Sequence, residues 1–429
     1  MFYDIIIIGG GASGLCTAIW SKKENNTVLV LEHNSIAGKK ILSTGNGRCN
    51  ITNAFASVEL FDSNPEGLIP YMTSGDPLFF QEAVSQFDCH DTINFLGDLG
   101  MLCTDKEGYI YPRSAQASSV QEILTAKCSD LGVDVVTGHD VKTITKKKNS
   151  EFIVDSKYES HNLVIAAGGL SGTNTGNDGS GYQMARSFGH TIINTIPALC
   201  GIKCSDSFFR ILKGTRADGM LSFASGGTQI SVRGNIQFTD YGISGIPAFQ
   251  ISSIIGYMIA DGMAPVITVD FIPEIALYDL VQLLYRNYTS LPKSVRSQKP
   301  EERMLKGLLG RNVINAVLRQ YAHVKDTSSP DAVCLALART IKMFQVHPYD
   351  LMPFENAQTT AGGVSTDEID PLTMESKLVK GLFFTGEIMD VNGICGGYNL
   401  QWAWSSGHIA GKNAADATKN DDQVSQNQK

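Results

Sequence analysis

The sequence predicts an α/β fold in which the two ends of the chain build one domain and the middle of the chain forms an insertion. Two observations carry this prediction. An apolar run at residues 2–8 ends in glycines, and a helical pattern at 13–23 and a second apolar run at 27–31 follow it. This is the order of a parallel strand–helix–strand unit. A glycine-rich α/β pattern returns near residue 358, with a last strand at 381–385. A domain built from the N-terminal part alone would not account for this late segment.

The boundaries of this organisation follow from changes in composition along the chain. A chain of 429 residues is longer than one small core usually organises, so more than one unit is expected. The predicted parts are a nucleotide-binding domain, first part, at 1–190, a β-rich, barrel-like insertion at 191–273, a helical subdomain at 274–340, a return through the β-rich domain at 341–356, the second part of the nucleotide-binding domain at 357–415, and a disordered polar tail at 416–429. Within them we expect helices at 77–99 and 302–321 and two short strands at 229–232 and 235–238.

The composition is that of an ordinary globular enzyme, with 43% hydrophobic and 18% charged residues. The formal net charge of −8 argues against a general nucleic-acid binder, whose phosphate contacts need a basic face. The most apolar stretch, residues 251–269, is interrupted by Asp261 and Pro265, so it is not a lipid-facing helix. Nine scattered cysteines are typical of a reducing compartment. We expect a cytoplasmic protein with a small-molecule substrate and no nucleic-acid or membrane partner; its oligomeric state stays open.

A glycine fingerprint stands where the first strand meets the first helix. The segment Gly9–Gly14 reads GGGASG and fits G-x-G-x-x-G. In this motif Gly9 permits the tight turn, Gly11 lets a pyrophosphate approach the backbone, and Gly14 allows close packing of helix and strand. Glu32, at the end of the next strand, is placed to accept hydrogen bonds from an adenosine ribose. The fingerprint predicts a dinucleotide site but does not by itself separate FAD from NAD.

Further motifs give the chain a family resemblance. They are the segments Gly38–Asn53, Tyr109–Ser114, Phe238–Gly245, Thr360–Val364, Met374–Lys377 and Gly386–Ala403. With these motifs the chain resembles the FAD-dependent family that includes BaiN, YhiN and aminoacetone oxidase-like proteins, over nearly its whole length. The resemblance implies a Rossmann-like FAD-binding domain built from both chain ends, with an inserted β-rich domain and a helical subdomain. It also implies FAD as the cofactor. No His or Cys stands in a recognised flavin-attachment context, so we expect FAD to be bound non-covalently.

The predicted cofactor residues come from six segments of the chain. In the loop 39–53, glycines let the backbone close over a planar ring, and Arg48 offers donors to phosphates or to flavin carbonyls. Gly386–Glu387 resembles the acidic pair that contacts the ribityl or phosphate region in flavoproteins with two such motifs. A helix from Asn399 to Lys412 would aim its positive end at the flavin pyrimidine. The complete predicted set is Gly9, Gly11, Ala12, Ser13, Gly14, Glu32, His33, Lys39, Lys40, Thr44, Gly45, Asn46, Arg48, Cys49, Asn50, Ala167, Gly168, Gly386, Glu387, Asn399, Leu400 and Gln401.

The sequence gives few candidates for the chemistry itself. Arg48 would either tune the flavin ring or hold cofactor phosphate, and Tyr398 is a candidate proton donor. Cys49 and Cys395 would form a redox dithiol only if they met in space; otherwise they are small buried thiols. The histidines and cysteines show no metal-ligand spacing, so we expect no metal.

The reaction predicted first is NAD(P)H-linked reduction of a conjugated C=C bond in a small or medium organic substrate, with bile acids and other steroids as possible examples. A second G-x-G-x-x-G is missing from the sequence, so a nicotinamide donor would dock only transiently against the flavin. The alternatives are an O₂-dependent oxidase of a small amine such as aminoacetone, and a flavin-bound redox sensor or RNA-associated protein without a small substrate.

Overall fold

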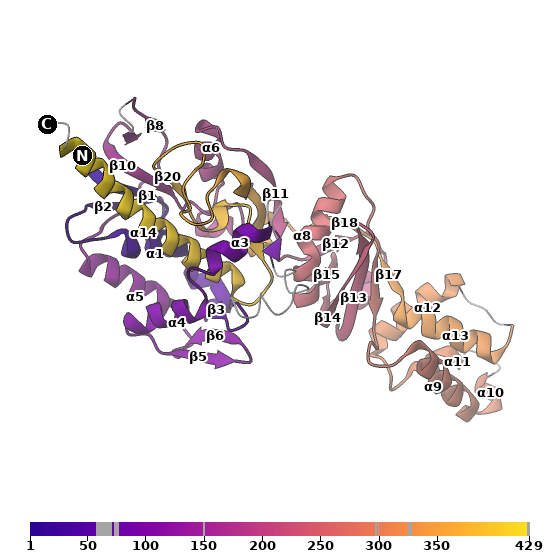
Figure 1. Ribbon diagram of the computed structural model, residues 1–429. Helices are drawn as coiled ribbons and strands as arrows, with labels where there is room; N and C mark the ends of the chain where they lie inside the picture. The colour runs from indigo at the N-terminus through magenta and orange to yellow at the C-terminus, as the bar shows by residue number, and fades with distance from the viewer. Residues whose placement is uncertain are drawn as a thin grey trace. The chain divides into compact units, whose positions relative to one another are not determined.

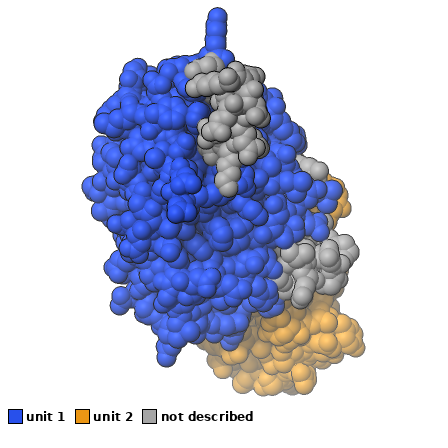
Figure 2. All heavy atoms as spheres, turned by 60° about the vertical axis from the view of Figure 1, so that its left-hand side comes forward, with its two compact units in different colours: residues 1–198, 357–429 blue, residues 199–356 orange. Residues whose placement is uncertain are grey.

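The computed structural model describes residues 1–56, 71–72, 77–148, 151–296, 298, 300–324 and 328–426. The chain divides into two compact units, which Figure 2 shows in different colours. Unit 1 comprises Met1–Ala198 and Ala357–Lys429, and unit 2 comprises Leu199–Asn356. The sequence places the first of these boundaries at residue 190.

Unit 1 is built on a seven-stranded sheet to which both parts of its chain contribute (Figure 1). Its strands are β1 (Phe2–Ile8), β2 (Val28–Glu32), β7 (Asp134–Thr137), β8 (Ile144–Lys146), β9 (Phe152–Val154), β10 (Tyr158–Ile165) and β20 (Leu382–Phe384). They lie in the order β7-β2-β1-β10-β9-β8, with β20 also paired to β10. The pairs β7–β2, β2–β1, β1–β10 and β10–β20 are parallel. Since β20 comes from the C-terminal part, the predicted α/β domain made from both chain ends is confirmed.

Helices α1 (Ala12–Ser21), α5 (Ala117–Asp130) and α14 (Tyr398–Gln426) pack around this sheet. Helix α14 lies along α1, as Figure 1 shows, and small residues allow the close approach. A Cβ atom on Gly407 would lie 2.8 Å from the Ser13 carbonyl oxygen, and one on Gly411 would lie 2.7 Å from that of Thr17. The C-terminal helix therefore fixes the position of the helix that follows the glycine fingerprint.

The smaller elements of unit 1 surround the sheet. They are η1 (Ile41–Gly47), β3 (Thr52–Asn53), β4 (Tyr71–Met72), α3 (Pro77–Val84), α4 (Cys89–Asp98), β5 (Cys103–Lys106), β6 (Tyr109–Pro112), η3 (Thr173–Thr175), α6 (Ser180–Ser187), β11 (Ile192–Ala198), β19 (Thr359–Val364), η5 (Thr366–Glu368), η6 (Gly386–Ile388) and β21 (Asn392–Gly393). The short helix η4 (Phe354–Asn356) belongs to the end of unit 2. The single helix predicted at 77–99 is wrong, because Asp88 starts a second helix. Its side chain accepts the N–H groups of His90 and Asp91 at 2.7 and 3.1 Å.

Unit 2 combines a seven-stranded antiparallel sheet with a group of helices. The sheet order is β17-β16-β13-β14-β15-β12-β18. Its strands are β12 (Ile202–Cys204), β13 (Arg216–Ser225), β14 (Thr228–Phe238), β15 (Gly242–Ser244), β16 (Ile267–Asp270), β17 (Phe344–Val346) and β18 (Pro348–Leu351), and its helices are α7 (Phe209–Leu212), α8 (Ile246–Ala260), α9 (Leu277–Ser290), α10 (Lys293–Arg296), α11 (Pro300–Leu305), α12 (Arg311–Val324) and α13 (Pro330–Lys342). Helix α13 packs on β16 and β17, so the helical group lies at that edge of the sheet (Figure 1).

Three expectations about single elements are corrected by the structure. The two strands predicted at 229–232 and 235–238 are one strand, β14, because the ladder to β13 continues through Gly234. The helix predicted at 302–321 breaks between α11 and α12, where Gly307 has φ +91°. The polar segment from 416 continues α14 as far as Gln426, although the sequence predicts disorder there. Within the described residues, no helix combines the length and apolar character needed to cross a membrane.

Candidate functional site

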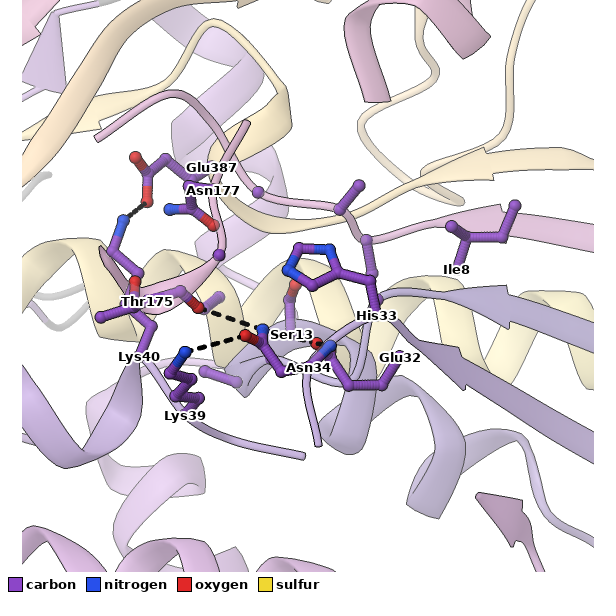
Figure 3. Close-up of a pocket in the computed structure, with 18 of the residues that line it drawn as sticks. Ile8, Ser13, Glu32, His33, Asn34, Lys39, Lys40, Thr175, Asn177 and Glu387 are labelled. Atoms are coloured by element: carbon purple, nitrogen blue, oxygen red, sulfur yellow. Dashed lines mark hydrogen bonds and ion pairs between the residues drawn. The ribbon is translucent and has the colours of Figure 1, made fainter. Parts of the chain in front are cut away.

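A pocket in unit 1 lies where β1, β2 and β10 end, at the carboxyl edge of the parallel sheet (Figure 3). The segments that follow these strands supply much of its wall, together with the start of α14 and the loop before η1. In open parallel sheets this edge is the usual place of ligand binding. Of the residues predicted to bind the cofactor, the pocket is lined by Gly9, Gly11, Ala12, Ser13, Glu32, His33, Lys39, Lys40, Thr44, Ala167, Gly168, Glu387, Asn399 and Leu400.

The three fingerprint glycines have different surroundings. Gly9 has φ +101°, and a Cβ atom there would lie 2.3 Å from the Ala166 carbonyl oxygen. A Cβ atom on Gly14 would lie 1.9 Å from the carbonyl oxygen of Gly9. At Gly11, by contrast, no described atom lies within 4 Å of the Cβ position. Gly9 and Gly14 are thus required by packing, whereas Gly11 leaves open space at the pocket wall.

Helix α1 begins directly behind this space. Gly11 is its N-cap residue, and no side chain in the described part of the chain caps the helix. The N–H groups of its first turn are therefore available to a ligand, and the helix dipole favours a negative one. Ser13, in this turn, also lines the pocket, and its hydroxyl lies 3.4 Å from the Thr385 carbonyl oxygen.

Glu32 ends β2 with its carboxylate held on both sides. Its Oε2 accepts the Gly10 N–H at 2.7 Å, and its Oε1 accepts the backbone and side-chain amides of Asn34 at 2.8 and 2.7 Å. The residue is only 7% exposed, yet it lines the pocket. An ionised carboxylate has about four lone-pair sites, so this one can accept further hydrogen bonds from a hydroxylated ligand.

An ion pair joins the segment before η1 to the C-terminal part of the chain. Lys40 Nζ lies 2.6 Å from Glu387 Oε2 (Figure 3). It also donates to the Ser171 carbonyl at 3.1 Å. Glu387 Oε1 accepts the Thr360 N–H at 3.0 Å. Lys39 Nζ reaches Asn34 Oδ1 at 3.0 Å. These contacts fasten the segment before η1 to two other walls of the pocket.

The opposite part of the wall includes the first turn of α14. Asn399 and Leu400 line the pocket there. The Asn399 side chain exchanges two hydrogen bonds of 2.9 Å with the backbone of Gly393, so it fixes the turn that leads into the helix. The positive end of a long helix therefore borders the pocket, a position that favours negative charge on a ligand.

These features can be compared with known proteins. A family model described as the HI0933-like protein Rossmann domain matches residues 3–413. The chain belongs to the HI0933-like family. The resemblance expected from the sequence motifs is thereby confirmed, and membership identifies the chain as an FAD-dependent oxidoreductase.

Relatives of this HI0933-like protein share its whole length. It is 36% identical over 421 residues to the 3-dehydro-bile acid delta(4,6)-reductase of Clostridium scindens, covering 96% of this chain and 98% of that protein. It is 29% identical to the ribosomal RNA dihydrouridine synthase of Escherichia coli, over 94% and 96% of the two chains.

Solved structures with the same fold are more distant. A flavocytochrome c3 fumarate reductase in its open conformation has 16% identity and a TM-score of 0.50, over 97% of this chain and 78% of the other. The 3-ketosteroid delta1-dehydrogenase of Sterolibacterium denitrificans has 11% identity and a TM-score of 0.51, over 97% and 100%. These two likenesses concern the fold.

Eight predicted cofactor residues lie outside the lining of the pocket. They are Gly14, Gly45, Asn46, Arg48, Cys49, Asn50, Gly386 and Gln401. Gly14 packs against the Gly9 carbonyl oxygen, and a Cβ atom on Gly386 would lie 2.5 Å from the Ser13 hydroxyl oxygen. Both glycines therefore allow close packing around the fingerprint turn. Gln401 is fully buried and accepts the hydroxyl groups of Thr52 and Thr92 at 2.6 and 2.9 Å. Its side chain ties α14 to its neighbours, which departs from the expected ligand role.

The candidate catalytic residues also lie outside this pocket lining. Arg48 is exposed, with its guanidinium 5.6 Å from the centre of the Tyr111 ring and its Nε 3.5 Å from the Gly45 carbonyl. Tyr398 is buried beside Ala56 and Cys89, and this burial raises its pKa to about 12. A phenol in that environment holds its proton tightly. The catalytic roles of Arg48 and Tyr398 stay predictions.

The thiols are reduced, and burial disfavours their ionised form. All nine cysteines lie in the described residues and none is paired. Burial raises the pKa of Cys49 to about 11 and that of Cys395 to about 12. Because the thiolate is the reactive form, neither residue resembles an activated redox thiol.

Several residues of the pocket wall carry no recognisable sequence signal. The loop after β7 contributes His139, Asp140 and Val141, and the segment after β10 contributes Thr175, Gly176 and Asn177. Gln358, Thr359, Val391 and Trp402 belong to the wall as well. The strand order could have indicated the loop after β7, because β7 pairs with β2, whose end carries Glu32. Strand order is not encoded in a local pattern of residues.

Proposed function

We propose that this protein reduces a C=C bond conjugated to a carbonyl group in an organic substrate, with NAD(P)H as a transient electron donor. The observation that carries the proposal is the relative with 36% identity over nearly both full chains, whose name specifies reduction of a 3-oxo steroid acid. The name of the more distant relative, a dihydrouridine synthase, also describes saturation of a ring C=C bond next to a carbonyl. A steroid-like enone is the substrate class we favour.

We place FAD in this pocket in an extended arrangement. The open space at Gly11 and the start of α1 would take the pyrophosphate, and the Glu32 carboxylate would take the adenosine ribose. The flavin would then extend toward Asn399 at the start of α14. When bound, the cofactor supplies hydride chemistry, which no side chain can provide.

The chain's own contribution is electrostatic and positional. The positive end of α14 would stabilise negative charge that develops on the pyrimidine edge, equivalent to roughly half a unit charge. The Lys40–Glu387 pair would hold two walls of the pocket at a fixed separation around the middle of the cofactor. Reduction of an enone places a hydride on one carbon and a proton on the other, and both additions have to be oriented by the protein.

A second candidate substrate is uracil within RNA, and the distribution of charge is the observation that favours it. Residues 199–356 contain 16 Lys and Arg against 13 Asp and Glu, whereas the rest of the chain contains 19 against 30. The negative net charge therefore belongs to the cofactor-binding unit. The expectation that no nucleic acid binds rests on the charge of the whole chain and does not extend to unit 2.

Anaerobic stopped-flow spectroscopy tests the proposal. The oxidised holoprotein is mixed with NADH or NADPH, and the reduced protein is then mixed with a 3-oxo-Δ4,6 steroid, with a uridine-containing ribosomal RNA fragment or with buffer. We expect flavin bleaching by a nicotinamide and re-oxidation by the conjugated steroid, with the saturated 3-oxo steroid as the matched control. Re-oxidation by RNA alone would support the second candidate. Bleaching by aminoacetone and re-oxidation only by O₂ would overturn both.

A further inference from the structure

The loop between β7 and β8 is fastened on two sides. Toward β2, the N–H of Gly138 donates to the Asn34 carbonyl at 2.8 Å and the N–H of His139 donates to the Glu32 carbonyl at 2.9 Å. On the other side stands Asp155, in the turn after β9. The start of the loop is thus tied to the backbone at the end of β2, where Glu32 stands.

Four groups of this loop contact the Asp155 carboxylate, and one of them is the Thr143 hydroxyl, which donates to Oδ1 at 3.4 Å. Its Oδ1 accepts the N–H groups of Lys142 and Thr143 at 2.9 and 2.8 Å, and its Oδ2 lies 2.9 Å from His139 Nε2. Its own N–H donates to the Thr143 carbonyl at 2.9 Å. Asp155 has φ +50°, a left-handed conformation that only a few non-glycine residues adopt. Burial opposes ionisation, but the N–H donors of Thr143 and Lys142 and the His139 ring lower its pKa, so the carboxylate is anionic at neutral pH.

The part of the loop between these anchors faces the pocket with free peptide groups. His139, Asp140 and Val141 line the pocket, and Val141 is only 6% exposed. Among the hydrogen bonds of the described residues, none involves the peptide N–H of Asp140 or Val141. Asp140 is exposed and Val141 is buried, and the unpaired peptide groups of this pocket wall are available to a ligand with complementary donors and acceptors.

The sheet order indicates which part of the cofactor lies there. Along the carboxyl edge, the end of β1 carries the fingerprint, the end of β2 carries Glu32 and the end of β7 carries this loop. Pyrophosphate, ribose and base follow one another in the same order in a dinucleotide. We propose that Asp155 is a positioning residue that sets the peptide edge of Asp140–Val141 to read the adenine base of FAD. This inference rests on the cofactor placement proposed above.

The reading is specific for the pattern of the base. The backbone of Asp140 and Val141 offers N–H donors and C=O acceptors, which complement the N1 acceptor and the amino group of adenine. Hypoxanthine presents the reverse pattern, an N1–H donor and a carbonyl, so both peptide groups would be left unpaired against it. Asp155 does not itself line the pocket; it acts by holding the peptide groups in place.

The test measures base preference in the full-length protein after FAD has been removed. FAD and flavin hypoxanthine dinucleotide are titrated separately, and the ratio of their Kd values is the readout. We expect the natural sequence to prefer FAD by about tenfold or more, since each unpaired polar group costs about 1–3 kcal/mol. Asp155→Asn keeps the size of the side chain but loses acceptor capacity, and should reduce this preference to about threefold or less.

A matched control exists in unit 2. Asp206 accepts the His347 N–H at 2.8 Å and lies 2.8 Å from His347 Nδ1, so Asp206→Asn disturbs a similar aspartate–histidine pair that does not line this pocket. The control should keep the preference of the natural sequence. If Asp155→Asn fails to fold, His139→Phe removes the hydrogen-bonding ring nitrogen that faces Asp155 and should lower the preference in the same direction.

The outcomes separate this inference from the proposed function. If Asp155→Asn and His139→Phe weaken both dinucleotides equally, or change neither, Asp155 has no role in reading the base. A natural protein that binds FAD without discriminating against hypoxanthine overturns the inference and leaves the proposed function intact. A natural protein that binds neither dinucleotide overturns the cofactor placement itself.

Discussion

The glycine turn at residues 9–14 and the loop at residues 41–53 both contribute to the pocket at the carboxyl edge of the sheet, but they are held in different ways. In the turn, backbone atoms lie so close to one another that side chains are excluded at Gly9 and Gly14. In the loop, Asn46 and Arg48 are exposed, and Asn46 has φ +55°. One region fixes backbone positions by packing, whereas the other offers side chains whose direction depends on what they meet. Substitutions in the turn should therefore change stability most, whereas substitutions of exposed side chains in the loop should have smaller effects.

The largest effect is expected at Gly14. In Gly14→Ala the new methyl group would stand 1.9 Å from the carbonyl oxygen of Gly9, and this backbone cannot move without disturbing the turn. Overpacking of this kind costs about 3 kcal/mol, more than the gain of about 1 kcal/mol in helix propensity. We expect a clearly lower free energy of unfolding for the protein without FAD, measured by urea denaturation. Unchanged stability would mean that the turn is less rigid than its contacts indicate.

Gly11→Ala sharpens the same comparison, because this position is open. Gly11 has φ −76°, which alanine adopts freely, and no described atom stands within 4 Å of the Cβ position. The stability of the protein without FAD should therefore stay within about 0.5 kcal/mol of the original. FAD affinity should fall by about 2 kcal/mol, or roughly thirtyfold, if the pyrophosphate approaches here. Isothermal titration of the FAD-free protein measures this, and unchanged affinity would place the pyrophosphate elsewhere.

The pH dependence of protein stability tests the packing of α14, the helix that lies along α1 behind the glycine turn. His408 on α14 stacks on Phe87 with ring centres 4.4 Å apart and meets Trp20 edge-on. Burial, together with the nearby Lys412, lowers the pKa of His408 to about 4 from an ordinary value near 6.5. The unfolded chain then binds a proton between pH 6.5 and 4 that the folded chain does not, so stability is present above pH 6.5 and falls with pH.

From these two pKa values the loss attributable to His408 is about 2 kcal/mol between pH 7 and pH 5. Urea denaturation at both pH values measures it, with His408→Phe as the control that keeps an aromatic ring against Phe87. The variant should lose less stability over this interval than the natural sequence. An identical loss in both proteins would assign the acid sensitivity to other groups.

The difference between the two regions also explains what could be predicted from the sequence. The fingerprint, Glu32 and the late strand β20 depend on local patterns and on backbone sterics, and the structure brings their segments together at one edge of the sheet. The wall formed by His139–Val141 depends on β7 lying next to β2, which is a long-range pairing without a local signature. Gln401 was expected at the cofactor, yet its partners Thr52 and Thr92 come from distant segments. Residue type and spacing predict where a backbone turns better than where a polar side chain ends.

The smallest effect is expected for a substitution of Arg48. This substitution tests whether the side chains of the loop contact the cofactor. The sequence predicts a role for its guanidinium either in tuning the flavin or in holding phosphate. Its position, exposed and 5.6 Å from the centre of the Tyr111 ring, instead indicates a surface contact worth about 0.5–1 kcal/mol. Arg48→Met should therefore change FAD affinity by less than about fivefold and leave the midpoint potential within about 10 mV, since 30 mV corresponds to about 1.4 kcal/mol for two electrons.

Both quantities are needed to interpret the variant, because the two predicted roles affect them differently. A fall in potential of tens of millivolts with FAD retained would show that the loop turns Arg48 toward the ring in the holoprotein. A large loss of affinity at constant potential would show that it reaches phosphate. Lys40→Met, at the residue just before this loop, provides the comparison, because Lys40 lines the pocket and its ion pair with Glu387 is partly shielded from solvent. If the Arg48 change proves the more damaging of the two, the loop rearranges when FAD binds, and its side chains are placed by the cofactor rather than by the fold.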